Sequence, residues 1–215
     1  MIRIIVNVIF VLLTVGYSAH AFAENEADVG SSGFSYSYIS LDYLYYSREL
    51  KTVPDSLDGD GFALDLSYAI RPHVALTAGY NVSEATLTTS GVLYEADIDS
   101  YRFGLLIHAA INEKSDFIVG ASFINGNADV SVSDGNKRSI DEDGGMTTIG
   151  FRALAYDSIE FSGFIRKNSI EDSSNYSISV AASYYAGDKV SIDLGSLIDS
   201  EGDSTLLSLG LTRYF

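Results

Sequence analysis

Side chains suited to acid–base or nucleophilic chemistry are scarce in this sequence. The 215 residues include three histidines, His20, His73 and His108, and no cysteine. Without cysteine, neither a disulfide nor a thiolate metal site can form. A histidine that acts as a general base must reach its substrate by a hydrogen bond, and His73 follows Pro72 in a tight connection. We therefore predict no catalytic residue and no cofactor, and we expect His108 to belong to an internal polar network.

Acidic residues are much more frequent, and they gather in polar stretches. Asp58-Gly59-Asp60-Gly61 is similar to the start of a calcium-binding loop, but the later ligand positions and the bidentate glutamate are missing. We predict no metal site within a single loop, so a divalent cation would have to be held by several loops together. The acidic residues expected in loops are Asp55, Asp58, Asp60, Asp129, Asp134, Asp141, Glu142, Asp143, Glu171, Asp172, Glu201 and Asp203.

The charge balance excludes some classes of partner. The chain has 13 Lys and Arg against 29 Asp and Glu, a formal net charge of −16. Such an excess of negative charge argues against binding to nucleic acid and against a basic patch that docks on anionic lipid. Cations and cationic partners remain compatible with it.

The first 23 residues have the order of a secretory signal peptide. Arg3 precedes an apolar run over residues 4–15, and Ala21-Phe22-Ala23 offers a small-residue cleavage site before Glu24. The apolar run is shorter than the roughly 20 residues that a membrane-spanning helix needs. We expect cleavage after Ala23, with a retained N-terminal helix as the alternative. Residues 24–215 then form one domain.

The rest of the chain alternates with period two, which is typical of β-strands. In residues 62–71, for example, Phe62, Leu64, Leu66 and Tyr68 would share one face, and polar or small residues the other. No later segment approaches 18 consecutive apolar residues, so no transmembrane helix is predicted. The ten strand candidates are residues 34–46, 62–71, 75–83, 97–111, 116–125, 146–156, 159–166, 176–185, 190–199 and 204–215.

The connections between these candidates alternate in length. The shorter ones span residues 71–73, 112–115, 157–158 and 186–189, and the longer ones 47–61, 84–96, 126–145 and 167–175, with a final short loop at 200–203. Transmembrane β-barrels sort their connections in this way, with short periplasmic turns and longer extracellular loops. In lipid the sheet must also close, because an open edge would leave backbone groups without hydrogen bonds. We predict an all-β, closed, antiparallel barrel of ten strands, or eight if two candidates belong to loops.

Seven charged residues fall on the polar face of their strands and are expected to line the lumen. A barrel of about ten strands has an interior narrow enough for side chains to fill. Mixed charges in such a lumen would pair and hold the barrel shut, or else line a narrow ion path. The seven residues are Asp42, Asp65, Arg102, Arg152, Glu160, Arg166 and Asp193.

The first strand candidate breaks the alternation. Phe34, Tyr36 and Tyr38 share a parity with Ser40 and Asp42, which belong to the lumen face. Either these aromatic residues lie inside the barrel, or a bulge near residues 38–39 returns them to the aromatic girdle at the periplasmic rim.

The C-terminus ends on an aromatic residue, with apolar residues at alternate positions before it. This segment resembles the last strand of Gram-negative outer-membrane β-barrel proteins, in particular the small barrels that include adhesion and invasion proteins. The resemblance implies a location in the outer membrane, contacts with its lipid and lipopolysaccharide, and recognition by the barrel-assembly machinery. The positions that match the assembly signal are Leu207, Leu209, Leu211 and Phe215.

Enzymes exist among such barrels, and one group is similar in strand number. Omptin-like proteases use acidic residues and an Asp-x-His pair at the outer rim; here Asp97 and Asp99 have no histidine near them in the sequence. The sequence therefore favours a non-enzymatic envelope protein that contacts its surroundings through acidic extracellular loops. A narrow porin-like channel is the alternative, and a barrel enzyme acting on lipid A or peptides is the third hypothesis.

Overall fold

The computed structural model describes residues 34–49, 56–89, 92–133, 135–170, 173–200 and 204–215. The expected signal peptide and its cleavage site lie outside the described residues. Among those described, no helix is long and apolar enough to cross a membrane. Ten strands account for nearly all of them: β1 Tyr38–Glu49, β2 Ser56–Arg71, β3 Val74–Thr89, β4 Val92–Asn112, β5 Ser115–Val132, β6 Lys137–Tyr156, β7 Ile159–Ile170, β8 Ser173–Tyr185, β9 Val190–Asp199 and β10 Ser204–Tyr214.

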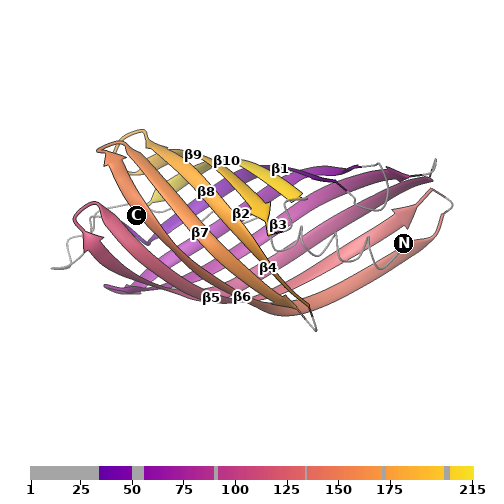
Figure 1. Cartoon of the computed structure of the whole chain (residues 1–215), viewed down its shortest axis with the longest axis horizontal. Coiled ribbons are helices and arrows are strands. Elements are labelled where there is room, and N and C mark those ends of the chain that lie inside the picture. The colour runs from indigo at the N-terminus through magenta and orange to yellow at the C-terminus, as the bar shows by residue number, and fades with distance from the viewer. Residues whose placement is uncertain (1–33, 50–55, 90–91, 134, 171–172, 201–203) are drawn as a thin grey trace.

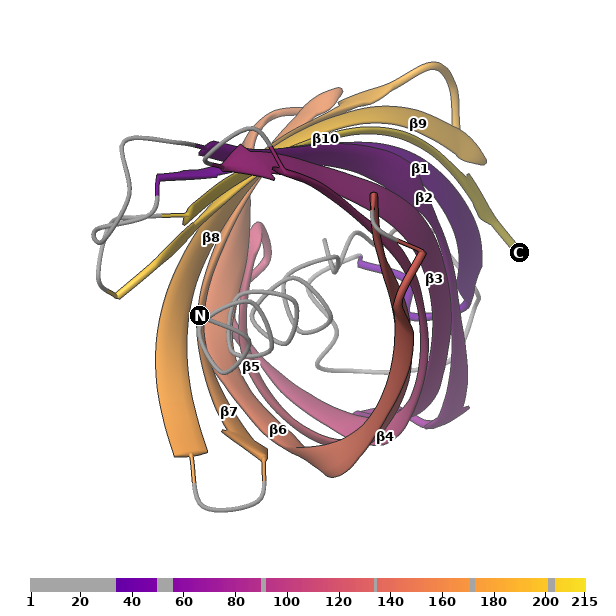
Figure 2. The same ribbon diagram turned by 90° about the vertical axis from the view of Figure 1, so that its right-hand side faces the viewer.

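The ten strands form one closed antiparallel barrel (Figures 1 and 2). Each strand pairs with its neighbours in sequence, and β1 closes the ring against β10, from Tyr38 opposite Tyr214 to Arg48 opposite Ser204. The ten-strand prediction is confirmed, and the eight-strand alternative is wrong. Over the height that all ten strands share, closure leaves no open sheet edge. A sheet in lipid must meet this condition, because lipid offers no hydrogen bonds to the backbone.

Strand alternation separates an apolar exterior from a largely polar interior. In β10, Leu207, Leu209 and Leu211 point outward and are about half exposed, whereas Ser208 and Thr212 are buried inside. The other strands repeat this pattern because successive side chains of a strand lie on opposite faces. Phe215, directly after β10, is also exposed. The four side chains of the expected assembly signal therefore lie on the outer surface.

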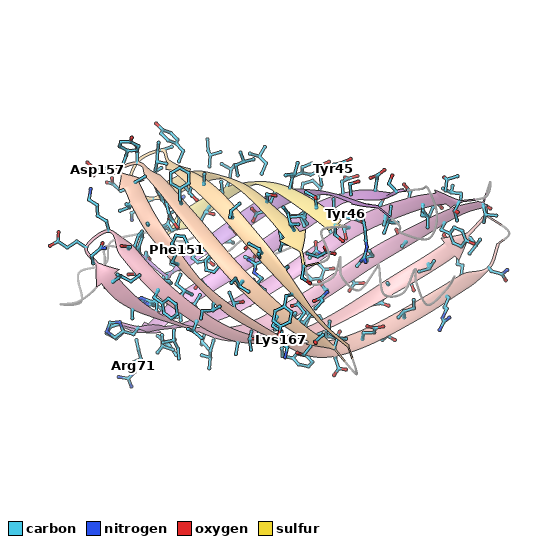
Figure 3. All side chains as sticks on the ribbon, viewed as in Figure 1. Tyr45, Tyr46, Arg71, Phe151, Asp157 and Lys167 are labelled. Atoms are coloured by element: carbon cyan, nitrogen blue, oxygen red, sulfur yellow. The ribbon has the colours of Figure 1, made fainter. Side chains whose placement is uncertain are left out.

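The two ends of the barrel differ. The connections 72–73, 113–114, 157–158 and 186–189 lie at one end, called here the turn end, together with residue 34 and the C-terminus. The other end is called here the loop end. Arg71 and Asp157 mark the turn end, and Lys167 lies towards the loop end (Figure 3). The ladder shifts register only beside the turns, between Ala69 and Arg71, Ala110 and Asn112, and Leu154 and Tyr156.

Much of the sequence expected to form loops is strand instead. Residues 84–96 and 126–145 continue β3 to β6, so the connections between these strands shrink to residues 90–91 and 133–136. These segments are rich in Ser, Thr, Asn and Asp, which is why their composition indicated loops. Pairing in register satisfies their backbone hydrogen bonds all the same. β3 to β6 consequently extend past the loop-end limit of β7 to β10 and form a one-sided wall (Figure 1).

The aromatic residues before Tyr38 lie inside the barrel. β1 begins at Tyr38 rather than at residue 34, and it pairs with both neighbours without a shift in register. Phe34 and Tyr36 are 5% and 3% exposed, within the same buried cluster as Tyr38 and Tyr214. Of the two alternatives for this segment, the interior placement is therefore the one observed, and the bulge is absent from β1.

Candidate functional site

All seven charged residues expected in the lumen are buried there. Each lies on an inward-facing strand position, and none is more than 9% exposed. Because burying an isolated charge is expensive, each should have compensating partners. Six of them fall into three groups, around Asp65, Glu160 and Asp193.

Arg102 and Asp65 form an ion pair across an intervening strand. Arg102 Nη2 donates a hydrogen bond to Asp65 Oδ1 at 2.5 Å. β3 separates the two residues, and its residue opposite both of them is Gly79. Since Gly79 has no side chain, the guanidinium can pass over β3 and reach the carboxylate. The pair thereby links β2 to β4 from the inside.

Arg152 and Glu160 form a bidentate pair on neighbouring strands. Arg152 Nε and Nη2 each donate to a Glu160 oxygen at 3.0 Å, and the Tyr185 hydroxyl donates to Glu160 Oε2 at 2.7 Å. The guanidinium carbon also lies 4.4 Å from the ring centre of Phe34 and 5.1 Å from that of Tyr36. Arg152 therefore holds both a strand carboxylate and the segment that precedes β1.

Asp193 and Asp42 lie on either side of a glycine. Asp193 accepts hydrogen bonds from Ser191 Oγ at 2.8 Å and Thr212 Oγ1 at 2.7 Å, and Asp42 accepts one from Ser40 Oγ at 3.2 Å. Gly210 is opposite both aspartates in the sheet register. A β-carbon at this position would come within 2.2 Å of Asp42 Oδ1. Gly210 thus provides the space that the Asp42 carboxylate occupies.

The last of the seven, Arg166, lies under the ring of Phe164, with 5.9 Å between its guanidinium carbon and the ring centre. It is 1% exposed. Its charge adds to the positive potential that the buried carboxylates of the lumen experience.

A further polar cluster, at the turn end, escaped the sequence analysis. The Tyr36 hydroxyl donates to Asp116 Oδ2 at 2.6 Å, and its ring stacks on His108 with 3.5 Å between centres. His108 Nδ1 lies 3.5 Å from the same Asp116 oxygen. The expectation that His108 joins an internal polar network agrees with this position. Asp116 lies at the start of β5, directly after a turn. The one sequence feature that indicates its inward position is its even number, which it shares with the inward-facing residues of β5.

An apolar layer fills the loop end of the lumen. The sequence predicted charged residues on the inner face but not this layer, because alternation alone does not reveal what the inner face carries at each height. The layer lies on the loop-end side of the charged residues, and the Tyr46 hydroxyl within it donates to the backbone oxygen of Glu84 at 2.6 Å. Its members are Leu44, Tyr46, Leu57, Ala63, Ala85, Leu87, Ala96, Ile98, Ala128, Val130, Ile170, Leu197 and Leu206.

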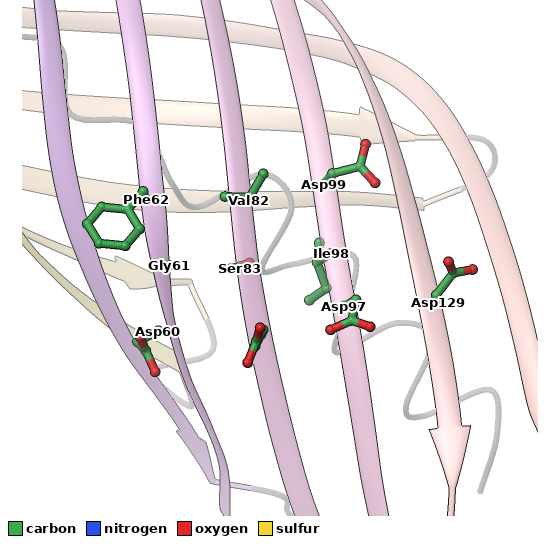
Figure 4. Close-up of a pocket in the computed structure, with 10 residues that line it drawn as sticks. Asp60, Gly61, Phe62, Val82, Ser83, Asp97, Ile98, Asp99 and Asp129 are labelled. Atoms are coloured by element: carbon green, nitrogen blue, oxygen red, sulfur yellow. The ribbon is translucent and has the colours of Figure 1, made fainter. Parts of the chain in front are cut away.

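The outer face of the sheet carries a row of carboxylates that runs from β2 into the wall. Asp60, Glu84, Asp97 and Asp129 are direct cross-strand neighbours on β2, β3, β4 and β5. They border a shallow groove on the outside of the sheet, with Asp99 close by (Figure 4). Like charges in opposing positions destabilise a sheet. The apolar exterior thus gives way to an acidic one along the same strands.

This acidic row does not amount to a metal centre in the described structure. Among the described residues, no three His, Asp or Glu side chains converge as metal ligands. Asp58, from the sequence similar to a calcium loop, instead accepts hydrogen bonds from Ser47 Oγ at 2.6 Å and Ser56 Oγ at 2.9 Å. The arrangement can attract cations and cationic surfaces over a broad area.

Comparison with known proteins supports the fold. No protein-family model matches the chain, and no curated protein matches it in sequence. Among solved structures, the transport unit of the autotransporter AIDA-I from Escherichia coli has a TM-score of 0.58 at 11% identity, covering 95% of this chain and 96% of that one. The translocator domain of the autotransporter NalP from Neisseria meningitidis has a TM-score of 0.53 at 7% identity, covering 89% and 90%. At such identities the similarity concerns the barrel architecture.

Proposed function

We propose that this chain is a non-enzymatic outer-membrane β-barrel protein with a sealed lumen, which acts through the wall that projects from its loop end. The single observation that carries the proposal is the filling of the interior at three heights. An apolar layer lies at the loop end, ion pairs lie in the middle, and the Phe34–Tyr36 segment lies at the turn end. A barrel closed in this way is suited to anchoring a surface rather than to conducting solutes.

Placement in the outer membrane is supported by the exterior. Outward-facing residues are apolar around the full ring, including Tyr43 on β1, Phe103 on β4 and Ile178 on β8. A closed sheet with such a band matches the requirements of lipid, which provides no hydrogen bonds to the backbone. The wall then stands on the extracellular side, and the turns face the periplasm.

The composition of the wall supports a role in surface contact. Its outer face is acidic at Glu84, Asp97 and Asp129, and Asp60 on β2 continues the same row. Such a surface would attract cationic groups, including the divalent cations that bridge lipopolysaccharide, and would repel anionic ones. An enzymatic role has less support, because His108 and His73 lie together at the turn end, with 5.7 Å between ring centres, away from the acidic face.

Single-channel recording in a planar bilayer tests the sealed lumen. We expect the refolded chain from Glu24 onward to be silent. A variant that combines Tyr46→Ala, Arg102→Ala and Arg152→Ala removes side chains from the apolar layer and from both ion pairs. It should show discrete openings. Tyr45→Ala combined with Lys167→Ala provides a control, because both side chains point outward. Openings of the unaltered protein that change with Arg102→Ala or Arg152→Ala would instead establish the narrow-channel alternative.

A further inference from the structure

One strand of the wall has an edge with no described strand beside it. On one side, β6 pairs with β5 from Ala153 opposite Ser115 to Lys137 opposite Ser131. On the other side its last described partner is Ile170, opposite Gly144. Residues 137–143, called here the β6 edge, therefore have no described strand beside them. Sheet edges of this length pair readily with another strand, and proteins usually blunt them with proline, a bulge, a covering loop or charged side chains. The β6 edge carries charges, but they are of opposite sign at its two ends, so they would repel a strand of like pattern only in some registers.

The hydrogen-bonding pattern shows which backbone groups face outward from this edge. Val132 N donates to Asn136 O at 2.9 Å in the hairpin that joins β5 to β6. In an antiparallel ladder, hydrogen-bonded and non-hydrogen-bonded pairs alternate. Even-numbered residues of the β6 edge are thus bonded to β5, and odd-numbered ones, such as Ser139 and Asp141, direct their N–H and C=O groups to the free side.

The sequence of the β6 edge is complementary to itself in the antiparallel direction. It reads Lys-Arg-Ser-Ile-Asp-Glu-Asp. When two copies are placed antiparallel about Ile140, Lys137 faces Asp143 and Arg138 faces Glu142. In this register odd residues face odd residues, so the outward N–H and C=O groups of the two copies meet as hydrogen-bonded pairs. The charge pattern and the hydrogen-bond pattern therefore select the same register.

We propose that the β6 edge is a homotypic docking site, at which the same edge of a second copy adds as an antiparallel strand. The pairing satisfies the backbone groups of Lys137, Ser139, Asp141 and Asp143 in both copies, and it places four ion pairs around the central Ile140 residues. Addition of a strand to an exposed sheet edge is an established mode of recognition, and a two-fold axis lets one sequence serve as both partners.

The direction of the strands decides where the second copy lies. Antiparallel strands of one continuous sheet are related by a two-fold axis perpendicular to that sheet, which turns the second barrel upside down. Two barrels upright in one membrane would instead cross their tilted strands at roughly 80°, since barrel strands tilt by about 40°. The second copy therefore belongs to an opposing membrane. This inference rests on the proposed placement of the wall outside the outer membrane.

Vesicle tethering tests the docking site. Phosphatidylcholine vesicles carrying the refolded protein, with the wall accessible to added protease, should aggregate with one another. We expect vesicles with Lys137→Glu and Arg138→Glu to fail to aggregate, because like charges then meet at every pair. Vesicles with Glu142→Lys and Asp143→Lys should fail for the same reason. When the two variants are mixed, every pair is complementary again and aggregation should return.

Two controls separate docking from general charge attraction and from misfolding. Glu95→Lys with Asp97→Lys makes the same charge change on β4, away from the edge, and should not rescue the first variant. Ser139→Pro removes one outward N–H and should abolish tethering, whereas Ser139→Ala, which equally loses the Ser139 hydrogen bond to Asn127 Oδ1, should retain it. The heat-dependent gel mobility of each variant verifies that its barrel is folded.

The outcomes distinguish this inference from the proposed function. Failure of the unaltered protein to aggregate vesicles, or a mixture of the two variants no better than either alone, overturns the docking site. Neither result bears on the sealed lumen, which the bilayer recordings test separately. Energy transfer between labelled copies within one vesicle, without aggregation, would also overturn it, because it would place both copies in one membrane.

Discussion

Buried charged residues determine how the interior of this barrel is filled. Arg152 is 2% exposed and contacts Glu160, Phe34 and Tyr36. It therefore joins β6, β7 and the segment before β1 with one side chain. A guanidinium suits this position, because its plane binds a carboxylate in two places and stacks on rings at the same time. The same residue thus belongs to the proposed seal and also links three segments from the inside.

Removing one partner of this pair should cost more than removing all of it. Arg152→Met leaves Glu160 buried without its cation, and we expect a loss of about 3–5 kcal/mol of stability. Arg152→Met combined with Glu160→Leu and Tyr185→Phe removes the whole polar group and should recover most of that loss. Urea unfolding in lipid vesicles, followed by tyrosine fluorescence, measures both. If the triple variant were as unstable as the single one, the loss of stability in Arg152→Met would not come from an unpaired buried charge.

At the scale of the strand, every position within the closed ring is constrained on both sides. Leu209 pairs with Tyr43 on β1 and with Leu194 on β9. Ser139 of the β6 edge, in contrast, has a described strand partner on one side, Asp129 on β5. The wall continues the strands of the barrel. A lost backbone hydrogen bond should nevertheless cost more in the closed ring, which lies in lipid, than at the β6 edge.

Proline substitution should reveal this difference. Leu209→Pro removes a ladder hydrogen bond on β10. The carbonyl on the neighbouring strand then loses its donor within the hydrocarbon region, where an unsatisfied backbone group costs several kcal/mol. We expect this variant to lose the folded band in heat-modifiable gel electrophoresis, whereas Leu209→Ala and Ser139→Pro retain it. A folded Leu209→Pro barrel would argue against β10 as a fully paired closing strand.

The whole molecule is asymmetric in both shape and charge. The wall rises from β3 to β6 only, and its outer face is acidic, while the chain as a whole carries a net charge of −16. The carboxylates of Asp60, Glu84, Asp97 and Asp129 repel one another across adjacent strands. Part of the stability of the barrel is therefore given up for a negative surface, which is consistent with a role that lies in that surface.

Salt should relieve this repulsion. We expect the urea midpoint of the unaltered protein to rise as sodium chloride increases from 0.01 to about 0.5 M, because the Debye length falls from roughly 30 Å to a few ångströms. Asp97→Asn, in the middle of the row, should raise the midpoint at low salt and lessen the dependence. Lys114→Gln, which removes an exposed cation from a turn, should not. If Asp97→Asn left the salt dependence of the urea midpoint unchanged, the row of carboxylates would not be the source of that dependence.

Several features of this protein follow from the sequence alone. Period-two alternation assigned the exterior and interior faces, and it placed Asp42, Asp65, Arg102, Arg152, Glu160, Arg166 and Asp193 on inward positions. Sorted connections and the terminal strand indicated a closed ring of ten strands. These inferences succeed because a strand exposes successive side chains to opposite faces whatever its partners are.

Only the tertiary structure decided which of these groups meet, and where the sheet ends. Arg102 reaches Asp65 because Gly79 lies between them, and Tyr36 enters the lumen to bind Asp116. The polar segments 84–96 and 126–145, expected as loops, continue the strands, so that the β6 edge has no described strand beside it. The physical reason is that such contacts depend on the register between strands, and alternation within one strand fixes only the parity of that register, not which residues face each other.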